Sequence, residues 1–395
     1  YNNHRFGILI CEDLWQAKSR ETLDGKGIQT LIAINASPYE QDKLNQRTKI
    51  VKTIASQGIN VLYVNQVGGQ DELIFDGQSF ALDHLQGMIA KANAFETQTL
   101  SLRLCNDMWQ ATIGMQKLPK EAEIYQALCL GLADFLRKNG LKKVVLGLSG
   151  GIDSALCLAL AVDSLGAENV HAILMPSQYS ATMSTEDAIS EAKALGVSYS
   201  IQPINELVGA FERNLPQINN AVTAQNIQAR IRGMILMAYA NEHQAMVLST
   251  SNKSEAAVGY CTLYGDMCGG LAILKDIYKT EVYALSRYRN SLSPVIPENV
   301  ITRAPSAELA PNQKDEDDLP PYEILDLILY DMIEKRLSRQ ELLAKSYDES
   351  LIQRIQQRLK SSEFKRFQAA PGLKIHQVGF TKDWRIPISN RFLDF

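Results

Sequence analysis

The sequence lacks several features that would identify whole classes of protein. Among its 395 residues, no apolar run approaches the roughly 20 residues of a membrane helix, and no signal peptide is visible. The net charge of −4 gives no basic surface for a nucleic acid. A composition of 46% hydrophobic and 21% charged residues is ordinary for a globular protein of two or three domains. We therefore predict a cytoplasmic protein that binds neither nucleic acid nor membrane.

The cysteines also lack a pattern. The sequence has six of them, with no C-x-x-C pair and no metal-ligand spacing relative to the five histidines. This scatter predicts free thiols in a reducing compartment rather than disulfides or a zinc site. The sequence begins at Tyr1 rather than Met, and a strand-like run follows at Phe6–Ile10. We expect the sequence to begin inside a domain, so that any targeting segment lies outside it.

Residues 1–104 contain short apolar runs separated by Gly, Asn, Asp and Pro, with one helical stretch at Asp42–Ser56. The pattern predicts an α/β or layered sheet domain. Residues 105–120 are less periodic and are interpreted as a linker. The expected strands are Phe6–Ile10, Leu31–Ile34, Asn60–Val64, Ser79–Leu82 and Thr99–Leu104.

Residues 121–395 form the second predicted domain, in which apolar strands alternate with helices. This order predicts a parallel, doubly wound sheet with its ligand at the carboxyl edge of the strands. The expected strands are Lys143–Leu148, His171–Met175, Ser198–Pro203 and Ala245–Ser249. The expected helices are Glu121–Asn139, Ile152–Leu165, Ser184–Leu195, Asn205–Asn214, Gln225–Glu242, Tyr322–Arg336, Ser338–Ser346 and Glu349–Ser361.

Two segments of this domain are predicted to be irregular. Residues 291–321 are rich in proline and contain the acidic run Asp315–Asp318, which indicates a long loop. The tail from Phe364 onward is basic and lacks a clear period.

A glycine-rich turn directly after the buried strand Val144–Leu148 carries the strongest chemical motif. Consecutive glycines let the backbone approach a phosphate, and the helix that follows offers free N–H groups and a positive dipole end. We predict that the turn binds the phosphates of ATP through Gly147, Leu148, Ser149, Gly150, Gly151, Ile152, Asp153 and Ser154. The simpler alternative is a strand–turn–helix in which Ser and Asp only cap the helix.

Two details specify the phosphate chemistry. No lysine precedes the final Ser of the turn, which argues against an NTPase that transfers a γ-phosphate. Asp153 would repel a phosphate unless a cation lay between them, so we assign Asp153 to Mg²⁺.

The S-G-G-x-D-S string resembles the PP-loop of the ATP pyrophosphatase superfamily, whose fold is adenine nucleotide alpha-hydrolase-like. Its members split ATP between the α- and β-phosphates and adenylate an acyl or carbonyl oxygen, and a nitrogen or sulfur nucleophile then displaces AMP.

Three further segments narrow the resemblance. Thr223–Gly233, Leu248–Asp266 and Pro305–Leu309 with the Asp315–Pro321 run are similar, together with the phosphate loop, to the NAD synthetase family. The resemblance covers about residues 121–395. It implies ATP-dependent amidation of nicotinic acid adenine dinucleotide (deamido-NAD) to NAD, with Mg²⁺ as cofactor and AMP and pyrophosphate as products.

The same resemblance implies residue roles. Thr250 and Lys279 would contact ATP, and Glu255 would join Asp153 at Mg²⁺ and also contact deamido-NAD. Asn226, Arg230 and Lys365, with its neighbour Arg366, would bind deamido-NAD. The loop at Asp315–Asp318 would close over the nucleotide, and the family implies at least a homodimer. For Arg230, Arg232, Lys279 and the acidic run, the alternative is an ordinary solvated surface.

Cys11 directly follows the first strand, at a strand-to-helix elbow that can lower a thiol pKa. The segment around it resembles the nucleophile elbow of nitrilase-like amidases, an α/β sandwich that forms the glutaminase half of glutamine-dependent NAD synthetases. The resemblance implies Cys11 as nucleophile and Ser37 and Lys43 as glutamine-binding residues. Taken alone, Cys11 is more often a buried filler residue.

The nitrilase-type site also needs a glutamate and a lysine well upstream of the cysteine, and only ten residues precede Cys11. We therefore expect either a truncated sequence or an inactive glutaminase half, with ammonia as the nitrogen donor of this chain. The intact protein would hydrolyse glutamine and pass ammonia internally. Two alternatives remain: another PP-loop amidotransferase, such as a GMP or asparagine synthetase, and a non-catalytic nucleotide-binding module.

Overall fold

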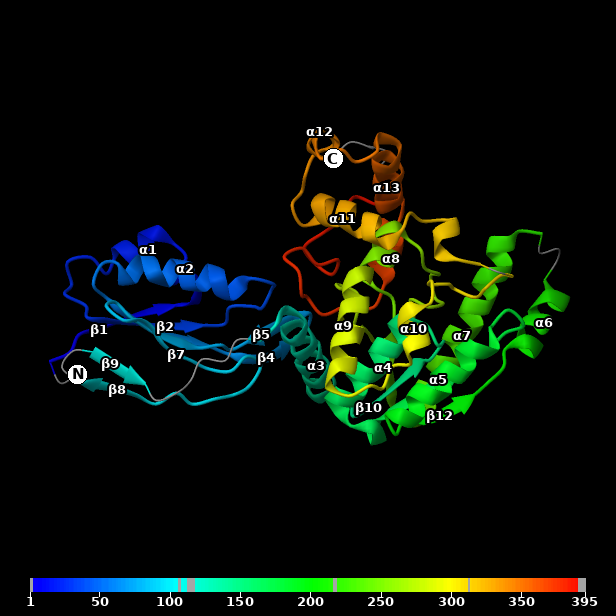
Figure 1. The fold of residues 1–395 in the computed structure, drawn as a ribbon, viewed down its shortest axis with the longest axis horizontal. Coiled ribbons are helices and arrows are strands. Elements are labelled where there is room, and N and C mark those ends of the chain that lie inside the picture. Colours follow the sequence, from blue (N-terminus) through cyan, green and yellow to red (C-terminus); the bar gives the residue numbers. More distant parts are fainter. Residues whose placement is uncertain (1–2, 106–107, 112–117, 216–218, 312, 390–395) are drawn as a thin grey trace. The chain divides into compact units, whose positions relative to one another are not determined.

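The computed structural model describes residues 3–105, 108–111, 118–215, 219–311 and 313–389. The chain divides into two compact units, Tyr1–Gly131 and Leu132–Phe395, and each is described by itself (Figure 1). Within the described residues, no helix combines the length and the apolar character that a membrane crossing requires.

Unit 1 is built on a five-stranded sheet in the order β1-β2-β3-β6-β7. The strands are β1 (Phe6–Ile10), β2 (Thr30–Asn35), β3 (Asn60–Asn65), β6 (Phe80–Asp83) and β7 (Gly87–Lys91). The first three are parallel and the last two antiparallel. The short helices η1 (Cys11–Leu14) and α1 (Ala17–Glu21) precede β2, and α2 (Lys43–Ala55) connects β2 to β3. Leu31, Val51 and Val61 belong to one buried cluster beneath α2.

Two hairpins complete unit 1: β4 (Val67–Gln70) with β5 (Leu73–Asp76), and β8 (Leu102–Cys105) with β9 (Met108–Ala111). The first was not predicted, because β4 reads V-G-G-Q and glycine disfavours strands. The second places a strand, β9, inside residues 105–120, which were interpreted as a linker. The domain boundaries proposed there stay a prediction, because residues 106–107 and 112–117 lie outside the described part.

Unit 2 contains the predicted parallel sheet. Its order is β12-β11-β10-β13-β14, and all neighbouring strands are parallel. The strands are β10 (Lys143–Gly147), β11 (Val170–Leu174), β12 (Ser198–Ile201), β13 (Ala245–Ser249) and β14 (Leu271–Ala272). The chain order reverses between β10 and β13, and such switch points are where open α/β sheets bind ligands beyond their carboxyl ends.

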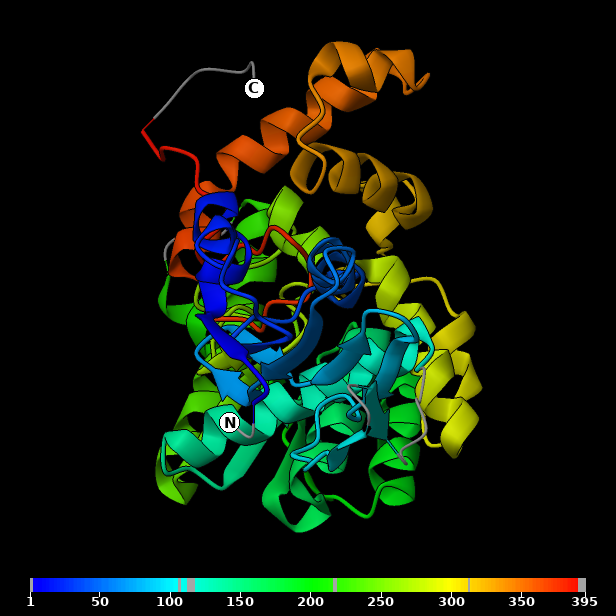
Figure 2. The same cartoon turned by 90° about the vertical axis from the view of Figure 1, so that its left-hand side faces the viewer.

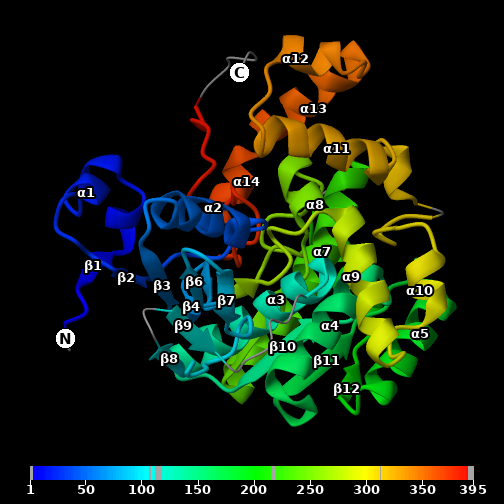
Figure 3. The same ribbon diagram turned by 60° about the vertical axis from the view of Figure 1, so that its left-hand side comes forward.

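Helices pack on this sheet. α4 contacts β10 and β11, α5 contacts β11 and β12, and α7 contacts β10 and β13 (Figure 3). The helices up to the proline-rich segment are α3 (Lys120–Lys138), which crosses the boundary between the units, α4 (Ile152–Leu165), α5 (Thr182–Ala194), α6 (Asn205–Asn214), α7 (Ala221–His243), α8 (Lys253–Val258), α9 (Lys279–Leu292) and α10 (Glu298–Thr302). The 3₁₀ turn η2 (Ala167–Asn169) precedes β11.

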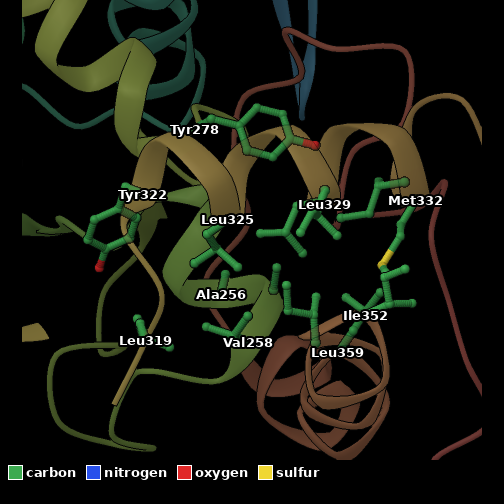
Figure 4. Close-up of a cluster of buried hydrophobic side chains, with 14 of the residues drawn as sticks. Ala256, Val258, Tyr278, Leu319, Tyr322, Leu325, Leu329, Met332, Ile352 and Leu359 are labelled. Atoms are coloured by element: carbon green, nitrogen blue, oxygen red, sulfur yellow. The ribbon is translucent and has the colours of Figure 1, made fainter. Parts of the chain in front are cut away.

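A second core lies among the helices that follow, drawn in orange in Figure 2. They are α11 (Tyr322–Ile333), α12 (Arg339–Ala344), α13 (Glu349–Ser361) and α14 (Glu363–Gln368). Leu325 and Leu329 of α11 pack with Ala256 of α8 and Ile352 of α13 in one buried cluster (Figure 4). This cluster fixes α8, a helix of the site described below, against the C-terminal helices.

Two predictions of irregular structure are corrected. The segment 291–321 contains α10 and the 3₁₀ turn η3 (Asp315–Asp317), and the tail begins with α14. In η3, Asp315 is only 3% exposed, so the acidic run is not simply a solvated loop.

Candidate active site

The predicted phosphate loop forms the turn from β10 into α4. The hydroxyls of Ser149 and Ser154 lie 3.0 Å apart, and the Gly151 N–H donates to Ser149 Oγ at 3.2 Å. Ser154 Oγ donates to the Gly151 carbonyl at 2.9 Å. These bonds hold the loop in a tight turn above the first turn of α4, where a helix N-terminus attracts anions.

Gly150 is required in this turn for two reasons. Its φ of +79° lies in the left-handed region that disfavours side chains. A Cβ at Gly150 would also lie 2.1 Å from the carbonyl oxygen of Ser184, in the first turn of α5. The loop therefore touches α5 through bare backbone, which only glycine permits.

Asp153, in the first turn of α4, joins a cluster of polar side chains from α8 and α9. Lys279 Nζ lies 2.5 Å from Asp153 Oδ2 and 3.3 Å from Glu255 Oε1. Asn252 Nδ2 donates to Asp153 Oδ1 at 2.8 Å. The structure thus brings together three predicted residues, Asp153, Glu255 and Lys279, and adds Asn252.

The ends of α8 and α9 are anchored to each other and to α11. Ser254 Oγ accepts from the Lys279 N–H at 2.9 Å and donates to Asp326 Oδ1 at 2.5 Å. Asp326 Oδ2 accepts from the Thr280 N–H at 2.8 Å. Free N–H groups at the start of α9 are satisfied in this way, and Lys279 is held beside Glu255.

Burial shapes the protonation of the cluster. Desolvation raises the pKa of Glu255 to about 8. It also raises the pKa of Asp315, which accepts a 2.9 Å hydrogen bond from the Tyr322 hydroxyl. Burial lowers the pKa of Lys279, but the Asp153 and Glu255 carboxylates outweigh it and hold that pKa above its ordinary value. Lys279 is therefore a charged ammonium.

Asp153 and Glu255 fit a magnesium ion. Their carboxylates converge on one cation, the Lys279 ammonium, and the raised pKa of Glu255 indicates that its charged form needs further stabilisation. No group of three or more His, Cys, Asp or Glu side chains suited to a metal occurs in the described part of the chain. Mg²⁺ ordinarily uses one or two carboxylates and completes its shell with phosphate and water, so the number of carboxylates here suits this ion.

A cavity of about 310 Å³ opens over the phosphate loop. Its lining includes every predicted ATP-binding residue except Gly150. The Gly150 carbonyl accepts a 2.7 Å hydrogen bond from Arg303, which does line the cavity. The lining residues from the loop and the strand ends include Gly147, Leu148, Ser149, Gly151, Ile152, Asp153, Ser154, Leu174, Met175, Leu248, Ser249, Thr250 and Ser251, and α8 adds Glu255.

The segment 300–309, with Asp315, forms another wall of this cavity. Glu308 Oε1 accepts from Ser184 Oγ at 2.5 Å, and Glu308 Oε2 accepts from the Ala181 N–H at 3.3 Å. This wall is thereby tied to the start of α5. Arg232, which also lines the cavity, donates to the Met175 carbonyl at 3.1 Å, and burial lowers the pKa of Arg232 to about 10.

The residues predicted to bind deamido-NAD, apart from Glu255, do not line this cavity. Asn226 Oδ1 accepts from Thr262 Oγ1 at 2.8 Å, and the exposed Arg230 donates to the Leu263 carbonyl at 3.2 Å.

Lys365 donates to the Gly259 and Cys261 carbonyls at 2.8 and 2.7 Å. Arg366 is 3% exposed and donates to the Ala257 carbonyl at the end of α8. Their predicted role stays a prediction, and for Arg366 the contacts are those of a helix cap.

Cys11 occupies the predicted elbow in unit 1, at the end of β1 and the start of η1. Its φ of +48° is unusual for a residue other than glycine. Ser37 is 4% exposed, and its hydroxyl accepts from Arg47 Nε at 3.1 Å. Lys43 Nζ lies 2.9 Å from Glu40 Oε1 and 5.4 Å from the centre of the Trp15 ring.

Asn252, Arg303 and Glu308 are site residues that the sequence did not single out. Asn252 and Glu255 have the i, i+3 spacing of a capping box, a pattern that could have marked the start of α8. Arg303 and Glu308 lie in a proline-rich segment that offers no such local pattern.

A phosphate loop at the switch point of a parallel sheet, with two carboxylates and a buried lysine beside it, defines unit 2 as a nucleotide-binding α/β enzyme domain. Residues 124–369 match the model of the family described as NAD synthase. The glutamine-dependent NAD(+) synthetase of Acinetobacter baylyi is 44% identical over 399 residues, which cover 99% of this chain and 74% of that relative. The chain belongs to the NAD synthase family.

Solved structures of NAD synthetases are also similar to this chain. The glutamine-dependent NAD+ synthetase from Acinetobacter baumannii, in complex with adenosine diphosphate, is 41% identical with a TM-score of 0.74 and covers 99% of this chain and 73% of that chain. The NH3-dependent NAD synthetase from Campylobacter jejuni, in complex with nitrate, is 32% identical with a TM-score of 0.53 and covers 63% of this chain and 96% of that chain.

Proposed function

We propose that unit 2 amidates deamido-NAD to NAD, with ATP as the energy source and an adenylated intermediate. The convergence of Asp153, Glu255 and Lys279 beside the phosphate loop carries this proposal. The family membership and the adenosine diphosphate bound to the Acinetobacter baumannii relative support it. The fold would then be adenine nucleotide alpha-hydrolase-like.

The chemistry needs a carboxylate oxygen of deamido-NAD to attack the α-phosphorus of ATP, which releases pyrophosphate. Ammonia then attacks the acyl carbon, and AMP leaves. In this scheme the phosphate loop and the α4 N-terminus bind the pyrophosphate group, and Thr250 lies at the carboxyl end of β13 to contact the nucleotide. The Lys279 ammonium stabilises the negative charge that develops on the pyrophosphate oxygen as its bond to the α-phosphorus breaks.

Asp153 and Glu255 would hold Mg²⁺, which supplies charge neutralisation on the phosphate oxygens when it is bound. The lining also includes the apolar side chains of Ile173, Leu174 and Leu236, which offer the kind of surface that a nucleobase needs. The cavity therefore offers the charged and the apolar surfaces that ATP requires.

One incubation tests this function. Protein, ATP, Mg²⁺, deamido-NAD and ammonium chloride are mixed, and NAD is measured by a coupled dehydrogenase assay. NAD formation that depends on both ATP and deamido-NAD is expected. Absence of NAD with folded protein would exclude the proposed reaction.

We also propose that unit 1 is part of a nitrilase-like glutaminase domain with Cys11 as nucleophile. The support is the elbow position of Cys11 and its left-handed backbone, because strained backbone gathers at functional sites. Glutamine binding by Ser37 and Lys43 belongs to this proposal, although the Ser37 hydroxyl already accepts from Arg47.

Cys11→Ala tests this assignment. In a protein that contains the complete glutaminase domain, the variant should lose glutamine-driven NAD formation by at least about 10³-fold, because the nucleophile is removed. Ammonium-driven turnover should stay at the wild-type rate. Cys105→Ala, a cysteine outside the elbow, serves as the control. Glutamine-driven turnover that survives in Cys11→Ala would show that another residue performs the hydrolysis.

We also propose that the protein acts as a homodimer in the cytoplasm. α7 carries Met234 and Met237, which are 65% and 42% exposed, next to the exposed Arg230. An apolar stripe on a helix beside a residue predicted to bind the dinucleotide suits an interface with a second copy. Light scattering that found a monomer at micromolar concentration would contradict this part.

A further inference from the structure

We propose that Asn252 is a positioning residue that fixes the orientation of Asp153 and its separation from Glu255. This inference rests on the proposed function, because it concerns the two carboxylates assigned to Mg²⁺. Asn252 itself does not line the cavity, whereas its two partners, Asp153 and Glu255, do. Its effect would therefore pass through the residues that it holds.

The side chain of Asn252 is fully buried and uses both of its polar atoms. Its Oδ1 accepts from the Glu255 N–H at 2.9 Å, and its Nδ2 donates to Asp153 Oδ1 at 2.8 Å. The two partners determine the orientation of the amide, because a backbone N–H only donates and a carboxylate only accepts. Asn252 is thus the N-cap of α8 and a donor to Asp153 at the same time.

These contacts form a closed ring of Asp153, Asn252, Glu255 and Lys279, which contains both carboxylates assigned to Mg²⁺. The two oxygens of Asp153 have different partners: Oδ1 contacts Asn252 and Oδ2 contacts Lys279. The Asn252 N–H lies 3.5 Å from Glu255 Oε2, and Lys279 Nζ lies 3.3 Å from Glu255 Oε1. The Asp153 carboxylate therefore cannot rotate without breaking a bond to α8 or to α9.

Only an amide side chain of this length satisfies both partners. Aspartate has the same shape and caps helices well, but it cannot donate to Asp153 and would repel it. Serine also caps helices, but its hydroxyl is one bond shorter and cannot reach Asp153 while it accepts from Glu255. Asn252→Asp and Asn252→Ser thus keep the cap and remove the donor, which separates positioning from helix capping.

Asn220 provides a matched control. It is the N-cap of α7, and its Oδ1 accepts from the Val222 N–H at 2.8 Å. Asn220 is exposed and does not line the cavity. Asn220→Asp makes the same chemical change at a helix start outside the site.

The test measures metal binding, stability and turnover together. Mn²⁺ is titrated by electron paramagnetic resonance in the presence of α,β-methylene-ATP, melting temperatures are recorded, and kcat and KM are determined for ammonium-driven NAD formation. For Asn252→Ser we expect about 10-fold weaker Mn²⁺ binding and about 100-fold lower kcat, the scale on which partners of metal ligands act. KM for deamido-NAD should change little, and the melting temperature should stay near wild type. Asn252→Asp should be at least as impaired, and Asn220→Asp should match wild type.

Wild-type Mn²⁺ affinity and kcat in Asn252→Ser would overturn the positioning role and leave the proposed function intact. Wild-type protein that binds no Mn²⁺ and forms no NAD would overturn both. If Asn252→Asp fails to fold, Asn252→Ser decides, because it introduces no buried charge.

Discussion

Asp153→Asn should lower kcat for ammonium-driven NAD formation by roughly 10³-fold or more, the scale on which a lost transition-state charge partner acts. The amide keeps the size of the carboxylate but cannot neutralise a metal ion. Glu255 would still pair with Lys279, so the buried ammonium would not be left alone. The fold should therefore survive, and Mn²⁺ binding should weaken together with kcat.

Asp163→Asn is the matched control for this prediction. Asp163 lies on the same helix, α4, and its Oδ2 is 2.6 Å from Arg289 Nε. Neither residue lines the cavity. Because Arg289 is buried, loss of the Asp163 charge should lower the free energy of unfolding by about 1–3 kcal/mol, and it should leave kcat unchanged. Equal kcat in Asp153→Asn and wild type would refute the metal role of Asp153.

Gly150→Ala should both destabilise the protein and abolish nucleotide binding. The φ of +79° alone costs alanine about 1 kcal/mol. The new Cβ would also lie 2.1 Å from the Ser184 carbonyl oxygen, so either the loop or α5 must move. We expect a total loss of about 2–4 kcal/mol in the free energy of unfolding, from strain and steric displacement together. Affinity for α,β-methylene-ATP should fall by at least about 100-fold, because the phosphate contacts depend on loop geometry.

Gly140→Ala separates the cost of the left-handed backbone from the cost of the steric contact. Gly140 has a φ of +71°, but no atom lies within 4 Å of a Cβ built there. Urea unfolding of this control should show the backbone cost alone, and calorimetry should show normal nucleotide binding. If Gly150→Ala were no less stable than Gly140→Ala, the contact between the loop and α5 would not be tight.

The sequence predicted the parts of the site that are local in the chain. The phosphate loop, the limits of α4 and the strand β13 all follow from short patterns of glycine and apolar residues. Asp153 was predicted from its position in the phosphate loop, and Glu255 and Lys279 were predicted from the family resemblance. The structure brings the three together.

Contacts between distant segments could not be predicted. Asn252 and Asp153 lie 99 positions apart, and nothing local in either segment indicates that one bonds to the other. Conversely, the family resemblance assigned Lys365 and Arg366 to deamido-NAD binding, and this role stays a prediction. The structure shows both side chains donating to main-chain carbonyls around the end of α8, contacts that their charge did not indicate. The charge of a side chain is visible in the sequence, but its partner depends on packing.

The position at which ATP is cleaved tests the central claim most directly. Protein, ATP, Mg²⁺, deamido-NAD and ammonium are incubated, and the products are followed by ³¹P nuclear magnetic resonance, with one sample lacking deamido-NAD. We predict AMP and pyrophosphate in amounts equal to the NAD formed, and no net cleavage without deamido-NAD. ADP and inorganic phosphate as the products would contradict a site that splits ATP between its α- and β-phosphates.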